Sequence, residues 1–307
     1  MIDRGILLCG GTGELGGEIA RRLSARGIPF RALVRPTTDA VELETLGAEV
    51  VRGDLRDAAS LVPAVAGIGT VISTANSMAR QLEGARNLTI RDVDERGYEN
   101  LIAACEAAGV DRFVFASALG DFEAARTPFT DAKVATEARL RGSKLHEVIV
   151  RADMFQEVWF SPIVGFDWPH GKVTIYGEGR SHHAYVALGD VADAIVRLAL
   201  ATDPPCSIEI AGPEALSRQE AVEAFERVLR RPIRTRHIPR VALRIGRTLM
   251  ARPRPALASV MGMALEADLS DTLVRDEGLR SLGIEARPVG RYIEEVAGSA
   301  ARAAAPA

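Results

Sequence analysis

The chain has few cysteines, few lysines and few aromatic residues, and the shortage of cysteine limits its chemistry. Cys9, Cys105 and Cys206 are odd in number, far apart and set in apolar surroundings. We therefore expect buried thiols rather than disulfides or a metal site. The five histidines also lack the spacing of metal ligands, and the adjacent His182 and His183 should point to opposite sides of a strand. The sequence predicts no metal centre.

Long hydrophobic runs are absent as well. No run approaches the roughly 20 apolar residues that span a bilayer. The N-terminus leads directly into a charged residue and a strand pattern, without a signal peptide. The formal net charge of −3 gives no general attraction to nucleic acid or to an anionic membrane. We expect a cytoplasmic protein with neither of these as a partner, and 47% hydrophobic residues in 307 are enough to bury a large core.

A glycine-rich turn near the N-terminus is the most informative motif. An apolar run over residues 5–9 is typical of a buried parallel strand, and a helix pattern over residues 14–26 follows the glycines. Glycine allows a tight turn, a close approach of the backbone to a pyrophosphate and close packing of the helix, whose N-terminus favours phosphate. The motif predicts a dinucleotide site made of Gly10, Thr12, Gly13, Glu14, Leu15 and Gly16.

The end of the second strand indicates which dinucleotide is bound. A carboxylate about twenty residues past the glycines would hold the ribose of NAD, whereas an arginine would hold the 2′-phosphate of NADP. Arg35 stands at this point, directly after the strand pattern of residues 30–34. A guanidinium makes planar, bidentate contacts to phosphate, so NADP(H) is the expected cofactor. The alternative is a solvated arginine in a loop.

Strand and helix patterns alternate through the first half of the chain. Further strands are expected at residues 48–52, 70–73, 112–116 and 147–150, and Gly109 should end a long helix before the third of these. Such alternation implies a Rossmann-type, doubly wound parallel sheet, with ligands beyond the carboxyl ends of its strands. Asp54, with Leu55 beside it, lies at such an end. Asp54 could accept a hydrogen bond from the adenine amino group, or it could cap the next helix.

Several segments resemble the NmrA-like group of atypical short-chain dehydrogenases/reductases. They include GGTGELGG, LVRP, GDLRD, ENLIAACEAAGVDRFVFASALG, VIVRADMF and YVALGDVADAIVRLAL, which together cover most of residues 5–230. The resemblance implies an NADP-binding Rossmann core over residues 1–152, with returning segments near 183–212. Residues 153–307 would then form mostly a smaller substrate-binding lobe and C-terminal helices.

The resemblance also assigns catalytic positions, with one departure. Members of the group that are reductases commonly have a serine after the fifth strand, and a tyrosine and a lysine four residues apart on the next helix. Ser117 and Lys133 match the serine and the lysine, but Phe129 replaces the tyrosine. Lys133 should bind the nicotinamide ribose. Phenylalanine cannot donate a proton, so that role falls to the substrate, a water, Ser117 or one of a further set of side chains: Asp121, Thr130, Tyr185 and His183.

An aromatic cluster follows the sixth strand, where the substrate pocket of this family usually lies. Both tryptophans of the chain occur between residues 153 and 170. The expected substrate-contacting residues are Phe129, Phe155, Trp159, Phe166 and Trp168, which would suit a small apolar or aromatic molecule. The alternative is that these rings form the core of the lobe. Residues 227–265 contain arginines and no acid, for which internal charge pairing or a solvated helix face is the expected explanation.

Two functions remain open from the sequence. The first is an NADPH-dependent oxidoreductase acting on an apolar ketone, a quinone or a polycyclic aromatic compound without the usual tyrosine. The second is a non-catalytic NADP-binding regulator that reports the redox state of the cofactor through a protein partner. Ser117 and Lys133 favour the enzyme, and Phe129 favours the regulator.

Overall fold

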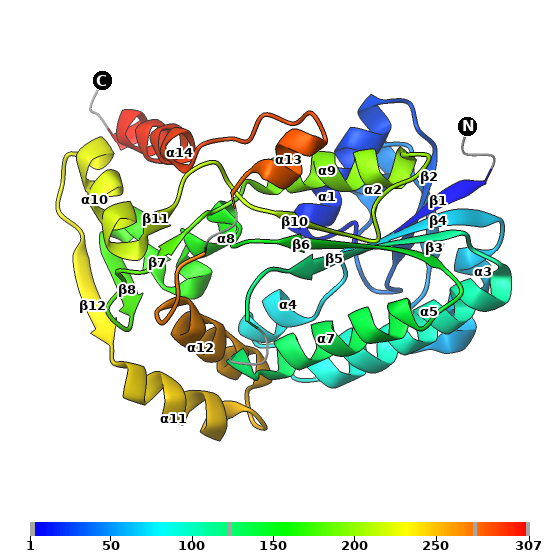
Figure 1. Ribbon diagram of the computed structural model, residues 1–307, viewed down its shortest axis with the longest axis horizontal. Helices are drawn as coiled ribbons and strands as arrows, with labels where there is room; N and C mark the ends of the chain where they lie inside the picture. Colours follow the sequence, from blue (N-terminus) through cyan, green and yellow to red (C-terminus); the bar gives the residue numbers. More distant parts are fainter. Residues whose placement is uncertain (1–3, 122–124, 273–274, 305–307) are drawn as a thin grey trace. The chain divides into compact units, whose positions relative to one another are not determined.

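A computed structural model describes residues 4–121, 125–272 and 275–304. The chain forms two compact units (Figure 1). Unit 1 comprises residues 4–118, 128–151 and 191–208. Unit 2 comprises residues 119–121, 125–127, 152–190, 209–272 and 275–304.

Unit 1 is built on a seven-stranded sheet with the order β10-β6-β5-β4-β1-β2-β3. The strands are β1 (Gly5–Cys9), β2 (Phe30–Val34), β3 (Glu49–Arg52), β4 (Ile68–Ser73), β5 (Arg112–Ala118), β6 (His146–Ala152) and β10 (Ser207–Ile210). Strand β1 pairs in parallel with both β2 and β4, so the direction of winding reverses between β1 and β4. Ligands of doubly wound sheets bind at this reversal. The predicted Rossmann-type fold is confirmed.

Helices cover both faces of this sheet (Figure 1). One layer contains α1 (Glu14–Ala25), α2 (Val41–Thr45) and α9 (Leu188–Leu200), and the other contains α3 (Ala58–Val65), α5 (Arg96–Ala108) and α7 (Pro128–Arg141). The segment between β4 and α5 holds the short α4 (Met78–Leu82) and a π-helical turn, η1 (Arg91–Glu95). Gly109 ends α5 with a φ of +66°, as predicted.

The core of unit 1 contains two of the three thiols. Cys9 and Cys105 are buried among Tyr98, Phe113 and their neighbours, and burial raises the pKa of both thiols, that of Cys105 to about 12. The prediction that Cys206 is also buried is wrong, because its thiol is exposed. The residue lies in a bend before β10, which is an edge strand of the sheet.

Unit 2 contains two small sheets surrounded by helices. The strands are β7 (Phe166–Asp167), β8 (Lys172–Tyr176) and β12 (Arg234–Ile238) in one sheet, and β9 (His182–His183) and β11 (Leu216–Ser217) in the other. The helices are α8 (Gln156–Trp159), η2 (Pro162–Val164), η3 (Trp168–His170), α10 (Arg218–Leu229), α11 (Arg240–Met250), α12 (Pro255–Ala267), α13 (Glu277–Ser281) and α14 (Val289–Ala304). His182 is exposed and His183 is buried, so the two side chains point in opposite directions as predicted.

Part of the arginine-rich segment is paired within unit 2. The Nε of Arg240 lies 2.6 Å from the buried carboxylate of Asp268, and its Nη1 lies 3.3 Å from Glu178. Internal charge pairing is therefore confirmed for Arg240. No helix in the described ranges is long and apolar enough to cross a membrane.

Candidate active site

The glycine turn between β1 and α1 is too tight for side chains at two positions. Gly10 has a φ of +91°, and a Cβ there would lie 2.7 Å from the backbone nitrogen of Ala75, just past β4. A Cβ on Gly16 would lie 2.0 Å from the carbonyl oxygen of Gly10. Gly13 is the N-cap of α1 and has no side chain to bind the first N–H groups of the helix. The turn therefore fits a pyrophosphate at the helix N-terminus.

The other predicted residues of the turn lie mostly at the surface. Thr12 and Glu14 are exposed and Leu15 is half-buried, so this surface is open to solvent in unit 1. Thr74 and Ala75 follow β4 and lie against Gly10. The sequence analysis did not assign these two residues, although both stand at the carboxyl end of a predicted strand.

Arg35 follows β2, with its side chain half-buried. A second arginine supports its loop: Nη1 of Arg52, at the end of the paired strand β3, donates to the carbonyl oxygens of Arg35 (3.1 Å) and Thr38 (2.6 Å). Sequence reasoning missed Arg52, because only the pairing of β2 with β3 brings the two arginines together. The loop thus holds a cation directly after β2, where the sequence predicts an arginine for the 2′-phosphate of NADP.

The alternative role of Asp54 as a helix cap is wrong. Asp57 caps α3 by accepting a hydrogen bond from the backbone nitrogen of Ala59. Asp54 instead binds the side chain and backbone of Arg56, and these hydrogen bonds hold the pKa of its carboxyl below the usual range. The Leu55 side chain is buried in the core of unit 1, so only its backbone is left for a ligand.

Lys133 is a buried lysine on α7. Its Nζ donates to the carbonyl oxygen of Ala116 at 2.6 Å and lies 4.4 Å and 5.3 Å from the ring centroids of Phe115 and Phe129. Only 7% of the residue is exposed. Burial lowers the pKa of the ammonium to about 8, although the charges of Asp94 and Glu137 act in the opposite direction. Near neutral pH, the group is a protonated acid that can release its proton easily.

A buried carboxyl, Asp94, faces the same region from the π-helical turn η1. It accepts hydrogen bonds from the backbone nitrogen and the hydroxyl of Ser77. Burial raises its pKa to about 6, despite these hydrogen bonds and the charge of Lys133. π-Helical turns occur frequently at functional sites. Sequence reasoning missed Asp94, and no motif in the sequence marks it.

Ser117 is held by a network that sequence reasoning also missed. Its Oγ donates to Oε1 of Glu137 at 2.7 Å. Glu137 lies one turn after Lys133 on α7 and receives ion pairs from Arg151 (2.5 Å) and Arg141 (2.7 Å). Burial alone would raise its pKa, but these partners and Ser117 hold the pKa of the carboxyl below its usual value. The proton of the Ser117 hydroxyl is thereby directed toward Glu137. The spacing of four residues from Lys133 was the available signal.

Of the aromatic residues predicted to contact substrate, Phe129 lies on α7 of unit 1 and the other four lie in unit 2. Phe166 is fully buried and packs edge-on against Phe160, with ring centroids 5.2 Å apart, so its prediction as a pocket residue is wrong. Trp168 stacks on Phe225 at 5.2 Å, and its ring belongs to the same core. The physical reason is that both rings pack against the other apolar side chains of this core, among them Tyr185 and Tyr292. Phe155 is half-buried, and its backbone forms an isolated parallel β-bridge with Val186.

Trp159 lines a small cavity within unit 2. The cavity has a volume of about 30 Å³ and is also lined by Met154, Tyr185, His183 and the buried Arg218. Arg218 donates to the carbonyl oxygens of Thr174, Trp159 and Val164, which ties three segments of the lobe together. Two of the candidate proton donors, His183 and Tyr185, thus lie here. A third, Thr130, is buried on α7 of unit 1.

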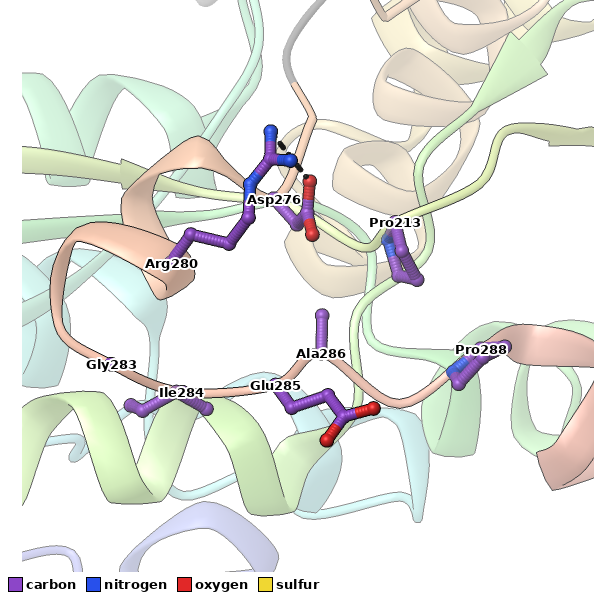
Figure 2. Close-up of a pocket in the computed structure, with 8 residues that line it drawn as sticks. All are labelled: Pro213, Asp276, Arg280, Gly283, Ile284, Glu285, Ala286 and Pro288. Atoms are coloured by element: carbon purple, nitrogen blue, oxygen red, sulfur yellow. Dashed lines mark ion pairs between the residues drawn. The ribbon is translucent and has the colours of Figure 1, made fainter.

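A wider pocket of about 520 Å³ also lies in unit 2 (Figure 2). Figure 2 shows the ion pair of Asp276 and Arg280 at one side and the loop of Gly283, Ile284 and Glu285 along its floor. None of the predicted site residues lines it. Within the described residues, no group of three histidine, cysteine or acidic side chains could hold a metal ion.

Fold and glycine turn together define a dinucleotide-binding protein of the Rossmann type. The chain matches the NAD(P)H-binding family over residues 10–202. It therefore belongs to this family, within the NmrA-like group that the motifs resemble.

Known relatives with assigned activities or roles differ from one another. The photosystem II assembly factor Ycf39 of Synechocystis sp. is 31% identical over 86% of this chain and 83% of its own length. The NAD(P)H azoreductase of Xenophilus azovorans is 25% identical over 75% of both chains. Among solved structures, the NADPH complex of an Escherichia coli quinone oxidoreductase has a TM-score of 0.74 at 17% identity, covering 95% of this chain and 99% of its own. The last similarity shows a shared fold.

Proposed function

We propose that this protein is an NADP(H)-dependent reductase of a small apolar or aromatic substrate, such as a quinone or a conjugated ketone. The single observation that carries the proposal is Lys133, a buried lysine with a pKa near 8 beside the ring of Phe129. Ionisable groups whose pKa burial shifts this far concentrate at functional sites.

The residues of unit 1 can be assigned roles in this reaction. The glycine turn and the N-terminus of α1 would hold the pyrophosphate of NADPH, and Arg35 would hold its 2′-phosphate. NADPH supplies a hydride when it is bound. Lys133 would bind the nicotinamide ribose and release a proton from Nζ to the substrate atom that gains negative charge when the hydride adds, such as the oxygen of a ketone or quinone. This proton replaces the one that the missing hydroxyl at Phe129 would supply. The neutral amine then takes up a proton from solvent.

Ser117 would assist this reaction only by exchanging its hydrogen bond from Glu137 to the substrate oxygen. Asp94 would act on Lys133 through its charge, and not by contact with substrate. The relative named NAD(P)H azoreductase supports the class of substrate, because an azo group, like a quinone, is an unsaturated, conjugated hydride acceptor.

A panel of quinones, azo dyes and conjugated ketones tests the proposal by the oxidation of NADPH. Wild-type protein should turn over at least one of them, and Lys133→Met should abolish this turnover. Lys144→Met is the matched control, since Lys144 is exposed near the end of α7 and should tolerate the same change. If NADPH binds and no member of the panel is reduced, the reductase proposal is overturned.

The second candidate is a non-catalytic role in the assembly or regulation of another protein. Two observations favour it: Ycf39 is a relative at 31% identity, and Ser117 is already bonded to Glu137. In that case, NADPH binding should change the affinity for a protein partner while the panel shows no turnover.

A further inference from the structure

Helix α11 of unit 2 exposes a stripe of aliphatic side chains. Val241, Ile245 and Leu249 are 64%, 54% and 64% exposed, and intervals of four residues place them along one face. Large apolar side chains that are this exposed, and that recur on one face, mark an interaction surface more often than isolated ones do. The function proposed above makes no use of this stripe.

The opposite face of α11 is fixed to α12. Leu243 is fully buried, and a Cβ on Gly246 would lie 2.5 Å from the sulfur of Met261. Pro239 precedes the helix and Pro253 follows it, so both ends of α11 are constrained as well. Because α12 occupies the other face, the stripe is held outward as a permanent feature of the surface. Figure 1 shows α11 beside α12 in unit 2.

The surroundings of the stripe carry one sign of charge. Residues 227–265 contain ten arginines and no aspartate or glutamate. Arg240 is paired with Asp268, and Arg247 donates to the carbonyl oxygen of Ala125. Arg244, Arg252 and Arg254 are exposed, and no side chain in the described part of the chain pairs with them. The stripe is therefore flanked by arginines available to an outside partner.

The chemistry of this surface selects its occupant. A second copy of the chain, docked through the same face, would bring the two sets of arginines together and would be repelled. A protein partner is less favoured, because residues 227–265 contain no aromatic residue and the cores of protein interfaces are rich in them. An anionic lipid surface offers negative charge at headgroup level and an apolar layer beneath it, which matches arginines beside an aliphatic stripe.

We propose that α11 docks this protein onto an anionic lipid surface, with Val241, Ile245 and Leu249 inserted among the acyl chains and Arg244, Arg252 and Arg254 at the phosphates. The net charge of −3, on which the sequence expectation of no membrane partner rested, does not oppose this. Charges more than about 8 Å away are screened at physiological ionic strength, so the local charge of the surface decides.

Sedimentation with vesicles tests the proposal on the full-length protein. Binding is expected to vesicles of phosphatidylcholine with phosphatidylglycerol, should weaken as salt is added, and should be absent with phosphatidylcholine alone. The double variant Ile245→Ser, Leu249→Ser should bind about ten- to a hundredfold more weakly. The variant Arg244→Glu should also bind more weakly.

Matched controls come from unit 1. Val41 and Val62 are each 63% exposed, so Val41→Ser, Val62→Ser removes similar apolar surface elsewhere, and Arg86→Glu reverses one exposed charge elsewhere. Both controls should bind vesicles as wild type does. Absence of binding to anionic vesicles overturns the proposal. Equal binding to neutral vesicles or equal losses in the controls would also overturn it, as would a dimer that only the α11 variants dissociate.

Discussion

At the scale of single residues, Lys133 is the most unusual group in unit 1. Its ammonium lies against two aromatic rings and one carbonyl oxygen, and burial moves its pKa to about 8. Such a group costs stability near neutral pH, because folding takes the charge out of water. The same property makes it an effective acid close to physiological pH.

The pH dependence of turnover follows from this pKa. Lys133 must be protonated to act as an acid, so kcat/KM should fall as the pH rises through about 8, by about tenfold per unit at high pH. Asp94→Asn removes a charge that raises the pKa of Lys133, so the descending limb should move to lower pH. Asp92→Asn, which removes another carboxylate of η1, is the control and should leave the descending limb unchanged. A limb that does not move in the Asp94 variant would contradict the coupling.

The stability of the fold should depend on pH in the same range. The pKa of Lys133 is about 8 in the folded chain and 10.5 as its ordinary value. Between these values the unfolded chain binds more protons than the folded one, so the free energy of unfolding rises with pH. Between about pH 7 and about pH 9.5, wild type should gain about 2 kcal/mol relative to Lys133→Met. Chemical denaturation at both pH values measures it, and a constant difference would contradict the burial of this charge.

Phe129 separates two explanations for the missing hydroxyl. If Lys133 already supplies the proton, Phe129→Tyr should leave turnover within about tenfold of wild type, although a well-placed general acid contributes about 10²- to 10⁴-fold. Steady-state NADPH oxidation by the variant is the measurement. A rise of about a hundredfold or more would show that wild type lacks an effective proton donor.

At the scale of elements, the ends of β2 and β3 act as a pair. Arg35→Ala should remove a charged contact to the 2′-phosphate and lower NADPH affinity by about ten- to a hundredfold, equivalent to about 1.5–3 kcal/mol, while NADH affinity changes little. Arg52→Ala should show a smaller loss, since Arg52 only binds the backbone of the Arg35 loop.

A third arginine, Arg31 on β2, provides the control for Arg35 and Arg52. Arg31 lies on β2 and donates to the carbonyl oxygens of Ala64 and Ala66, so Arg31→Ala should leave the ratio of NADPH to NADH affinity unchanged. Titration of both cofactors measures all three variants. Equal affinities for NADPH and NADH in wild type would refute the role of Arg35.

At the scale of the whole molecule, the sequence predicted what depends on local pattern. The order of strands, glycine turn and helix in the first half follows from spacing alone, and the agreement extends to the parallel pairing of β1 with β2 and β4. The contacts of Ser117 could not be predicted, because Glu137 and Arg151 meet it only after α7 packs on the sheet. Phe166 was misassigned for a related reason: a phenylalanine in a core and one in a pocket have the same local sequence signal.

The exposed thiol of Cys206 gives the native chain a single attachment point. Cys9 and Cys105 are buried, and their raised pKa values leave them as unreactive thiols, so a maleimide dye should modify one position without any mutation. That position lies in unit 1. With an acceptor dye on a cysteine introduced into unit 2, energy transfer between the two dyes would report the distance between the labelled positions of the two units. The measurement can be made in the presence and absence of NADPH.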